Sequence, residues 1–123
     1  MRQSHPKLTV RRAREADAFT IACVHVDSRW IAYRDILHPD ALGPMAYDKY
    51  HERWSARLSD KSDIRVACTQ TGHIVGFASG GAPRDRLTTY QSELYALYVR
   101  PECQGQDVGG VLLRAFIQSA HTR

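Results

Sequence analysis

Residues near the C-terminal end of the sequence have the types and the order needed to bind an anion. An apolar run at 93–99 leads into a polar, glycine-bearing turn at 102–110, and an apolar helix is expected at 111–117. A strand that enters a helix through such a turn points backbone N–H groups and the positive end of the helix dipole at one place, which favours phosphate. Glycines are also needed simply to connect a strand to a helix. From the residues alone, an anion site and an ordinary connection both remain open.

Other residues capable of chemistry do not form a recognisable site. His25 and Asp27 are two positions apart on an expected helix, so their side chains face different directions. The histidines lack the HExxH spacing of a zinc site, and Cys23, Cys68 and Cys103 are widely spaced and outside any CxxC pair. We therefore predict no metal site and no disulfide, but buried or free thiols in a reducing compartment.

The composition is that of one folded domain. The 123 residues are 43% apolar and 24% charged, which is typical of a globular chain with its own core. We expect a single domain over residues 1–123. No apolar run approaches the roughly 18 residues of a membrane span, and the first residues lack the apolar core of a signal peptide. The sequence therefore predicts a cytoplasmic protein without a membrane partner.

The net charge of +4 comes from dispersed cations. It fits a solvated surface, and it equally fits attraction of an anionic ligand. Zinc-finger spacing, an aromatic RNA-binding motif and a basic helix do not accompany this charge in the sequence. Nucleic acid is therefore not an expected partner.

The elements that must position these residues follow from the hydrophobic pattern. The sequence predicts a strand at 7–11, a helix from 14 to about 30, a second helix from 43 to about 59, a hairpin of strands at 64–70 and 73–79, a loop at 80–92 and a strand at 93–99. The predicted core stripes are Phe19, Cys23, Val26, Trp30 and Tyr33 on the first helix and Tyr47, Tyr50, Trp54 and Leu58 on the second. The strand at 93–99 is apolar on both faces after Glu93, which predicts an interior strand covered on both sides.

The string at 97–110 resembles the acetyl-CoA motif of the GNAT superfamily of N-acetyltransferases, which reads Q/R-x-x-G-x-G/A. Gln104 holds the first position of the motif and Gly109 the last, with a Val-x-Pro sequence ahead and an apolar helix behind. Similar features occur upstream at 28–36 and 74–81, so the resemblance spans nearly the whole chain. It implies an α/β fold of the mixed α+β kind, with a mainly antiparallel sheet flanked by helices.

The resemblance also implies an activity, namely transfer of an acetyl group from acetyl-CoA to a small-molecule or peptide amine. The amine attacks the thioester directly, without a covalent enzyme intermediate. By position, the backbone of Leu97 and Val99 would hold the pantetheine arm and the acetyl carbonyl. The residues that would line the diphosphate turn are Gln104, Gly105, Gln106, Val108, Gly109 and Gly110.

Glu93 occupies the position where many members of this superfamily carry a catalytic glutamate. An amine must lose a proton to attack, which calls for a general base within reach. Partial burial beside Tyr95 would raise the pKa of such a carboxylate, although a solvated carboxylate at a strand end is an equally open interpretation. Trp30 and Tyr33 lie where related enzymes begin their acceptor pocket, and each is interpreted either as a substrate contact or as a core residue.

Asp107 departs from the motif because it stands where the first glycine belongs. Glycine there permits positive φ and a close approach of phosphate, whereas aspartate adds a Cβ and a negative charge. Aspartate tolerates the left-handed region better than most residues, so the turn itself can survive. The added charge is expected to weaken acetyl-CoA binding unless the carboxylate turns outward or pairs with a cation.

The sequence also lacks the C-terminal strands that follow the motif helix in the superfamily. The strand at 93–99 would then be a hydrophobic sheet edge, which folded proteins seldom leave open. We therefore expect a second copy of the chain to cover that edge, giving a homodimer. The rival to an active acetyltransferase is a degenerate module that binds CoA or serves only in assembly.

Overall fold

The computed structural model describes residues 7–33, 45–59, 63–82 and 92–121. Its strands are β1 (Thr9–Arg12), β2 (Asp63–Cys68), β3 (Ile74–Gly81) and β4 (Glu93–Val99). Its α-helices are α1 (Ala18–Tyr33), α2 (Met45–Ser59) and α3 (Val108–His121), and short 3-10 helices precede α1 (η1, Glu15–Asp17) and follow β4 (η3, Pro101–Cys103). All the helices and strands predicted from the sequence are present, and α3 begins earlier and ends later than predicted. The loop predicted to start at residue 80 was wrong at its start, because β3 continues to Gly81, and its residues 83–91 lie outside the described residues.

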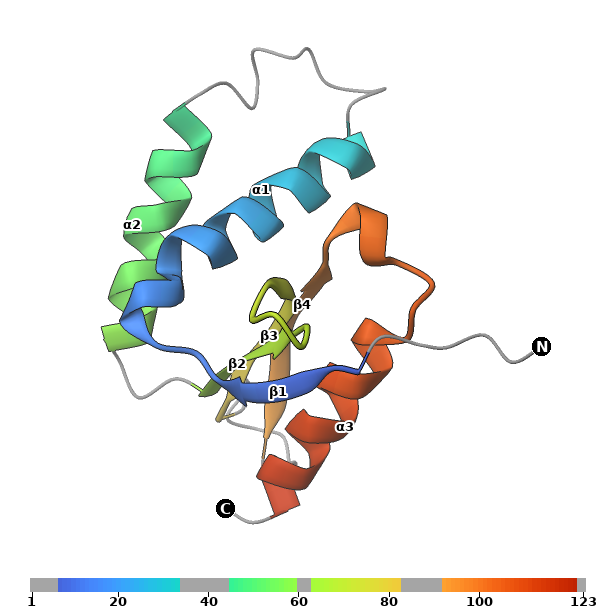
Figure 1. Ribbon diagram of the computed structural model, residues 1–123. Coiled ribbons are helices and arrows are strands. Elements are labelled where there is room, and N and C mark those ends of the chain that lie inside the picture. Colours follow the sequence, from blue (N-terminus) through green and yellow to red (C-terminus); the bar gives the residue numbers. More distant parts are fainter. Residues whose placement is uncertain (1–6, 34–44, 60–62, 83–91, 122–123) are drawn as a thin grey trace, which may run out of the picture.

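The strands form one antiparallel sheet in the order β1-β2-β3-β4. In Figure 1 the sheet is seen with β1 nearest the viewer and β4 farthest away. The helices α1 and α2 cover one face of the sheet and α3 covers the other, so the molecule has three layers (Figure 1). This arrangement confirms the predicted mixed α/β fold with an antiparallel sheet flanked by helices.

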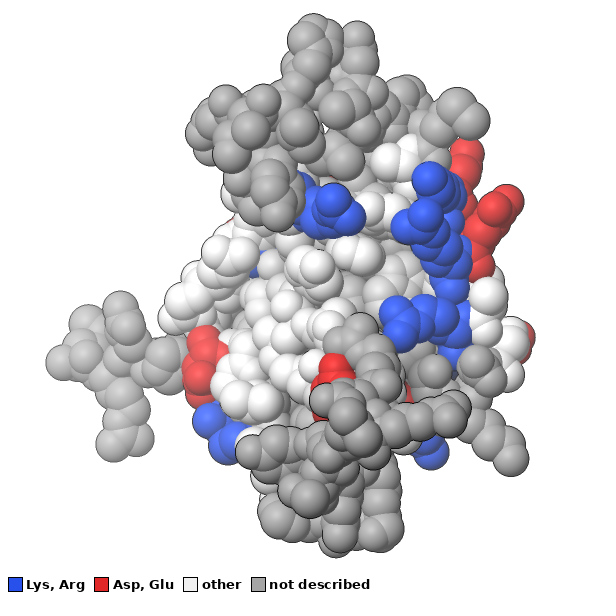
Figure 2. Space-filling view, turned by 180° about the vertical axis from the view of Figure 1, so that it is seen from behind, with Lys and Arg blue, Asp and Glu red and all other residues white. Residues whose placement is uncertain are grey.

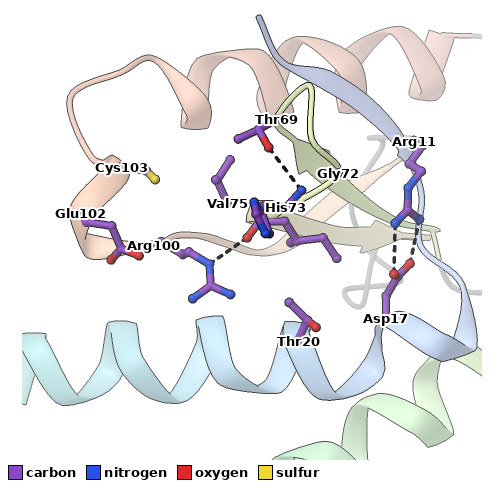
Figure 3. Close-up of a pocket in the computed structure, with 11 residues that line it drawn as sticks. Arg11, Asp17, Thr20, Thr69, Gly72, His73, Val75, Arg100, Glu102 and Cys103 are labelled. Carbon is purple, nitrogen blue, oxygen red and sulfur yellow. Dashed lines mark hydrogen bonds and ion pairs between the residues drawn. The ribbon is translucent and has the colours of Figure 1, made fainter. Parts of the chain in front are cut away.

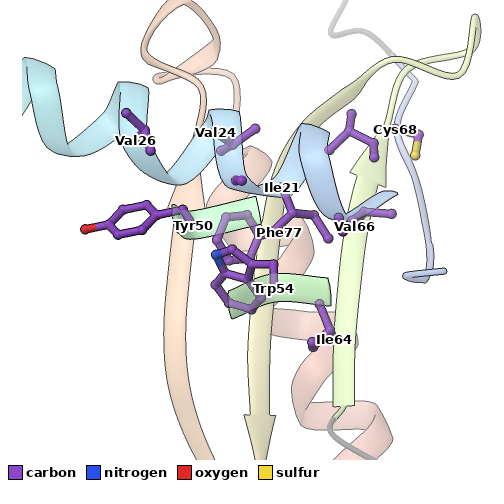
Figure 4. Packing of buried hydrophobic residues seen from close by; sticks show 12 residues of the cluster. Ile21, Val24, Val26, Tyr50, Trp54, Ile64, Val66, Cys68 and Phe77 are labelled. Atoms are coloured by element: carbon purple, nitrogen blue, oxygen red, sulfur yellow. The ribbon is translucent and has the colours of Figure 1, made fainter. Parts of the chain in front are cut away.

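The larger core lies between the sheet and the α1–α2 pair (Figure 4). Phe77 of β3 is fully buried there against Trp54 of α2, with the two ring centroids 4.9 Å apart. The stripe predicted for α1 was wrong at Phe19, whose side chain is 49% exposed and meets His51 edge-on. Because α1 packs against both the sheet and α2, its buried side is wider than one stripe and is made of Ala18, Ile21, Ala22, Val24 and Val26.

A second core lies between α3 and the opposite face of the sheet. Val108 and Leu112 of α3 are buried there against Val75 and Ala78 of β3. A Cβ on Gly80 would overlap the ring of Phe116, so glycine at this position lets α3 approach the strand closely. This second core fixes the start of α3 relative to the end of β4.

Strand β4 carries side chains into both cores, Tyr98 into the first and Leu97 and Val99 into the second. The prediction of a strand covered on both faces is therefore confirmed. Within the described residues, however, β4 pairs only with β3, which makes it an edge strand of the sheet rather than an interior one. Its outer edge is the surface on which the predicted site depends.

The described residues also bear on the predicted lack of a membrane-spanning segment and on the cysteines. None of its helices combines the length and the apolar character needed to cross a membrane. Cys23, Cys68 and Cys103 are free thiols, as predicted, and burial raises the pKa of both Cys23 and Cys103.

Candidate active site at the outer edge of β4

The peptide groups of Leu97 and Val99 point away from the sheet. The N–H of Arg100 donates to the carbonyl of Val75 at 2.8 Å, and peptide groups alternate in direction along a strand. Positions 98 and 100 therefore face β3, and positions 97 and 99 face outward. The hydroxyl of Ser28 on α1 donates to the outward carbonyl of Val99 at 3.1 Å, which agrees with this orientation.

A β-bulge in β4 decides where Glu93 points. Ser79 pairs with Ala96 and Gly80 pairs with Leu94, so Tyr95 is an extra, unpaired residue in β4. Leu94 therefore lies on the α3 face, in the same cluster as Leu97.

Alternation then places Glu93 on the opposite face, toward α1 and α2. Counting back four residues from Leu97 without the bulge would have placed the two side chains on the same face. Glu93 is half-buried and pairs with Gly81 of β3, and the Tyr95 hydroxyl donates to the carbonyl of Ala82. The candidate base therefore faces the α1–α2 side of β4.

A cavity of about 390 Å³ lies between the end of β4 and the start of α3. Its lining consists of Val99, Cys103, Gln104, Gly105, Asp107, Val108 and Gly109. This set contains five of the eight predicted cofactor residues, whereas Leu97, Gln106 and Gly110 do not line this cavity. The first turn of α3 borders this cavity. In that turn the N–H of Val111 donates a hydrogen bond to the carbonyl of Asp107 at 3.0 Å.

Glycine is favoured at positions 105 and 109 by different physical causes. Gly105 has φ +89°, a left-handed conformation that favours glycine whatever the surrounding space. Gly109 lies in the first turn of α3, where a Cβ would meet only Leu97 at 3.5 Å and Val99 at 3.9 Å, both ordinary contacts. Glycine costs a helix about 1 kcal/mol relative to alanine. Since packing does not require it, the small residue leaves room for a ligand to approach the backbone.

Asp107 takes up the left-handed conformation with φ +61°, so the turn survives the departure from the motif. Its carboxylate forms an ion pair with Arg114 at 2.9 Å. A Cβ on Gly110 would overlap Asp107 Oδ1. Gly110 therefore makes room for the aspartate side chain, and Arg114 partly neutralises its charge.

The two predicted acceptor contacts lie near the C-terminal end of α1. Trp30 is half-buried. Tyr33 is the last residue of α1, and its side chain is outside the described residues. Their predicted roles stay predictions.

His25 lies in an aromatic cluster that the sequence analysis missed. Trp54 Nε1 donates to His25 Nδ1 at 3.2 Å, and the imidazole stacks on Tyr50 with a centroid distance of 4.7 Å and contacts Tyr98 at 4.6 Å. Burial, together with nearby arginines, lowers the pKa of His25 to about 4, so the ring is neutral near pH 7. Only the three-dimensional packing brings these rings together, because they come from α1, α2 and β4.

Asp27 is not a partner of His25, in agreement with the sequence analysis. Its carboxylate accepts a hydrogen bond from the Tyr47 hydroxyl at 2.5 Å, which raises the pKa of Tyr47 to about 12. No group of three or more potential metal ligands occurs among the residues that the structure describes.

A second cavity, of about 550 Å³, lies on the other side of η3 (Figure 3). The Arg100 side chain projects into it and is held by a 2.7 Å hydrogen bond from Nε to the Ile74 carbonyl. Its far wall is the ion pair between Arg11 and Asp17, at 2.7 Å, which holds the pKa of Asp17 below its ordinary value. Cys103 of η3 lines both cavities.

Comparison with known sequences agrees with this geometry. Residues 29–123 match the model of the acetyltransferase (GNAT) family. An uncharacterized N-acetyltransferase, YuaI, of Bacillus subtilis is 38% identical over 106 residues, which cover 86% of this chain and 60% of that protein. An aminoglycoside N(6')-acetyltransferase type 1 of Stenotrophomonas maltophilia is 32% identical over 112 residues, which cover 87% of this chain and 63% of that protein. The chain thus spans less than two thirds of these relatives.

Solved structures show the same fold. The PaiA N-acetyltransferase of Thermoplasma acidophilum, solved with coenzyme A, gives a TM-score of 0.75 at 18% identity over 94% of this chain and 73% of that one. A GCN5-related N-acetyltransferase of Rhodopseudomonas palustris gives 0.68 at 30% identity over 100% of this chain and 70% of that one. Taken with the turn at the start of α3, these matches show that the chain belongs to the GNAT family of acetyltransferases.

Proposed function

We propose that the chain is an acetyl-CoA-dependent N-acetyltransferase that acts on an amine. The observation that carries this proposal is the continuity between the outward peptide groups of Leu97 and Val99 and the cavity at the start of α3. An extended arm with amide groups can pair with the edge of β4, while the turn N–H groups and the α3 dipole bind a diphosphate. Gly109 leaves the space that such a ligand needs.

In the proposed reaction the amine nitrogen attacks the acetyl carbonyl carbon, and the carbon–sulfur bond breaks. Acetyl-CoA supplies the activated acetyl group. Glu93 accepts the proton that the ammonium loses, from the α1–α2 side of β4. After the attack the nitrogen loses a second proton, which the departing thiolate takes up to leave as the thiol. The outward N–H groups at 97 and 99 orient the thioester and stabilise charge on its carbonyl oxygen.

Calorimetric titration with acetyl-CoA tests the binding step, and a thiol-release assay with a panel of amines tests the transfer. We expect micromolar binding by the natural chain. Glu93→Gln should slow the transfer at least tenfold and leave acetyl-CoA affinity nearly unchanged, because a positioned base typically contributes about 10²–10⁴-fold. A chain that does not bind acetyl-CoA, with binding restored in Asp107→Gly, would instead support a degenerate acetyltransferase, the rival that Asp107 favours.

We further propose that the protein is a homodimer joined across the outer edge of β4. Figure 2 views this side of the molecule, and uncharged side chains cover much of its centre. An open apolar sheet edge is a template for pairing with another strand. Light scattering at micromolar concentration tests this, and a monomer would contradict it.

The free thiols at Cys23, Cys68 and Cys103 support a cytoplasmic location.

A further inference from the structure

Three cations form a row along α2. Lys49, Arg53 and Arg57 are spaced four residues apart, so they lie above one another on the helix surface, and we call this row the basic ridge. Like charges at this spacing repel one another and weaken a helix. Among the described residues, the neighbouring acids Asp48 and Glu52 form no ion pair with the ridge. Within the part of the chain that the structure describes, the ridge cations therefore have no ion-pair partner, although Asp48 and Glu52 lie beside them on the helix.

Aromatic rings hold two of these cations in place. The Arg53 guanidinium lies 5.4 Å from the centroid of the Tyr50 ring, and the Arg57 guanidinium lies 5.1 Å from that of Trp54. Both rings are buried, with 8% and 3% exposed. A guanidinium held against a ring keeps its in-plane N–H donors available, and these match the two oxygens of a carboxylate or a phosphate. The two arginines are therefore partly pre-organised for an oxyanion.

Aromatic contacts connect the basic ridge to the strand that the proposed reaction uses. Tyr50, which contacts Arg53, stacks on His25, and His25 contacts Tyr98 of β4. Tyr98 stands between Leu97 and Val99 and faces the same side of the sheet as α1 and α2. Three aromatic rings in contact, those of Tyr50, His25 and Tyr98, therefore lie in series between Arg53 of the ridge and β4.

The positive charge of the ridge acts on these rings. Burial is the main cause of the lowered pKa of His25, and the positive charges of Arg29, Arg53 and Arg57 lower this pKa further. Figure 2 shows lysine and arginine side chains lined up along the α2 side of the face that looks onto the β4 edge. An acceptor that approaches Glu93 from the α1–α2 side meets this field, which repels a polycation and attracts an anion.

We propose that the acceptor carries, besides its amine, an oxyanion group that Arg53 and Arg57 bind. This inference rests on the acetyltransferase function proposed above and narrows its substrate class. The ridge selects acidic acceptors, such as a peptide whose N-terminal amine is followed by carboxylates or phosphates, over neutral or polycationic amines.

Matched peptides with one N-terminal alanine test the proposal, since the amine is the same in each. The full chain is titrated at low ionic strength with Ala-Glu-Glu, Ala-Gln-Gln and Ala-Lys-Lys amides, and their rates of acetylation are compared. We expect the acidic peptide to bind roughly three- to tenfold more tightly than the neutral one, with the lysine peptide weakest, and added salt to reduce the difference. A phosphoserine peptide distinguishes phosphate from carboxylate as the preferred oxyanion.

The double variant Arg53→Gln/Arg57→Gln should remove the preference while keeping the helix, because glutamine is a good helix former. Arg12→Gln, which removes one charge from β1 at the far edge of the sheet, serves as the control and should keep it. Equal affinity for the three peptides, or a preference that survives the double substitution, overturns the inference. Acetyl-CoA titrations of the same proteins separate this result from failure of the proposed function, because absence of acetyl-CoA binding counts against that function whichever peptide binds.

Discussion

The carboxylate of Asp107 and the guanidinium of Arg114 lie 2.9 Å apart at the start of α3. The aspartate holds the place of a motif glycine, and the arginine, seven residues later, reaches back to it. The charge that is least suited to the proposed diphosphate site therefore comes with a cation that partly cancels it. Both side chains are largely exposed, at 61% and 65%, so a ligand can reach them and separate them.

Asp107→Gly should strengthen acetyl-CoA binding, because it removes the negative charge and leaves Arg114 to attract the diphosphate. Arg114→Gln should weaken binding, because the Asp107 charge is then uncompensated. We expect shifts of roughly three- to tenfold in opposite directions, the size typical of exposed charges. Calorimetry at two salt concentrations checks this, and high salt should bring the variants closer together. Weaker binding by Asp107→Gly would show that the carboxylate helps the ligand.

Gly109→Ala should separate ligand binding from folding. The protein atoms leave room for a Cβ at 3.5 Å, so the variant should be as stable as the natural chain or more stable, by up to about 1 kcal/mol. Acetyl-CoA affinity should fall at least tenfold, because the methyl group enters the cavity. Gly105→Ala is the opposite control, since its positive φ makes it destabilising although no atom lies within 4 Å of the Cβ. An unchanged acetyl-CoA affinity in Gly109→Ala would show that the diphosphate does not bind beside residue 109.

His25 should make the fold sensitive to mild acid. Its pKa falls from 6.5 in the unfolded chain to about 4 in the folded one, chiefly through burial. Between these values the unfolded chain binds a proton that the folded chain does not, so the free energy of unfolding decreases as the pH drops, by about 1–3 kcal/mol in all once solvent screening of this half-buried group is counted. Urea denaturation at pH 4.5 to 7.5 measures this. In His25→Gln the contribution of this residue to the slope should disappear, and an unchanged slope would assign the effect to other groups.

Two adjacent leucines of α3 provide a matched test of the second core. Leu112 is fully buried and Leu113 is 41% exposed. Leu112→Ala should lower the free energy of unfolding by about 2–5 kcal/mol, because it leaves a cavity against β3. Leu113→Ala should cost less than about 1 kcal/mol in the monomer. Equal losses measured by denaturation would mean that Leu113 is buried against a surface outside the described monomer.

The sequence by itself determined the order and the type of the helices and strands and the place of the glycine-bearing turn between β4 and α3. These features depend on local patterns, namely apolar spacing along each helix, alternation along each strand and glycines between 102 and 110. Asp107 illustrates how far such reasoning reaches. Its tolerance of positive φ was predictable from residue type, whereas its pairing with Arg114 depended on how α3 begins.

The tertiary structure alone decided which way the site residues point. The bulge at Tyr95 arises from pairing with β3 and turns Glu93 to the α1–α2 face, against the count from Leu97. Phe19 has the spacing of a core residue and is exposed, because α1 buries the residues that face both the sheet and α2. A strand register and a helix rotation are set by contacts between segments far apart in the chain, and one residue of shift exchanges the two faces of a strand. Local sequence patterns do not contain that information.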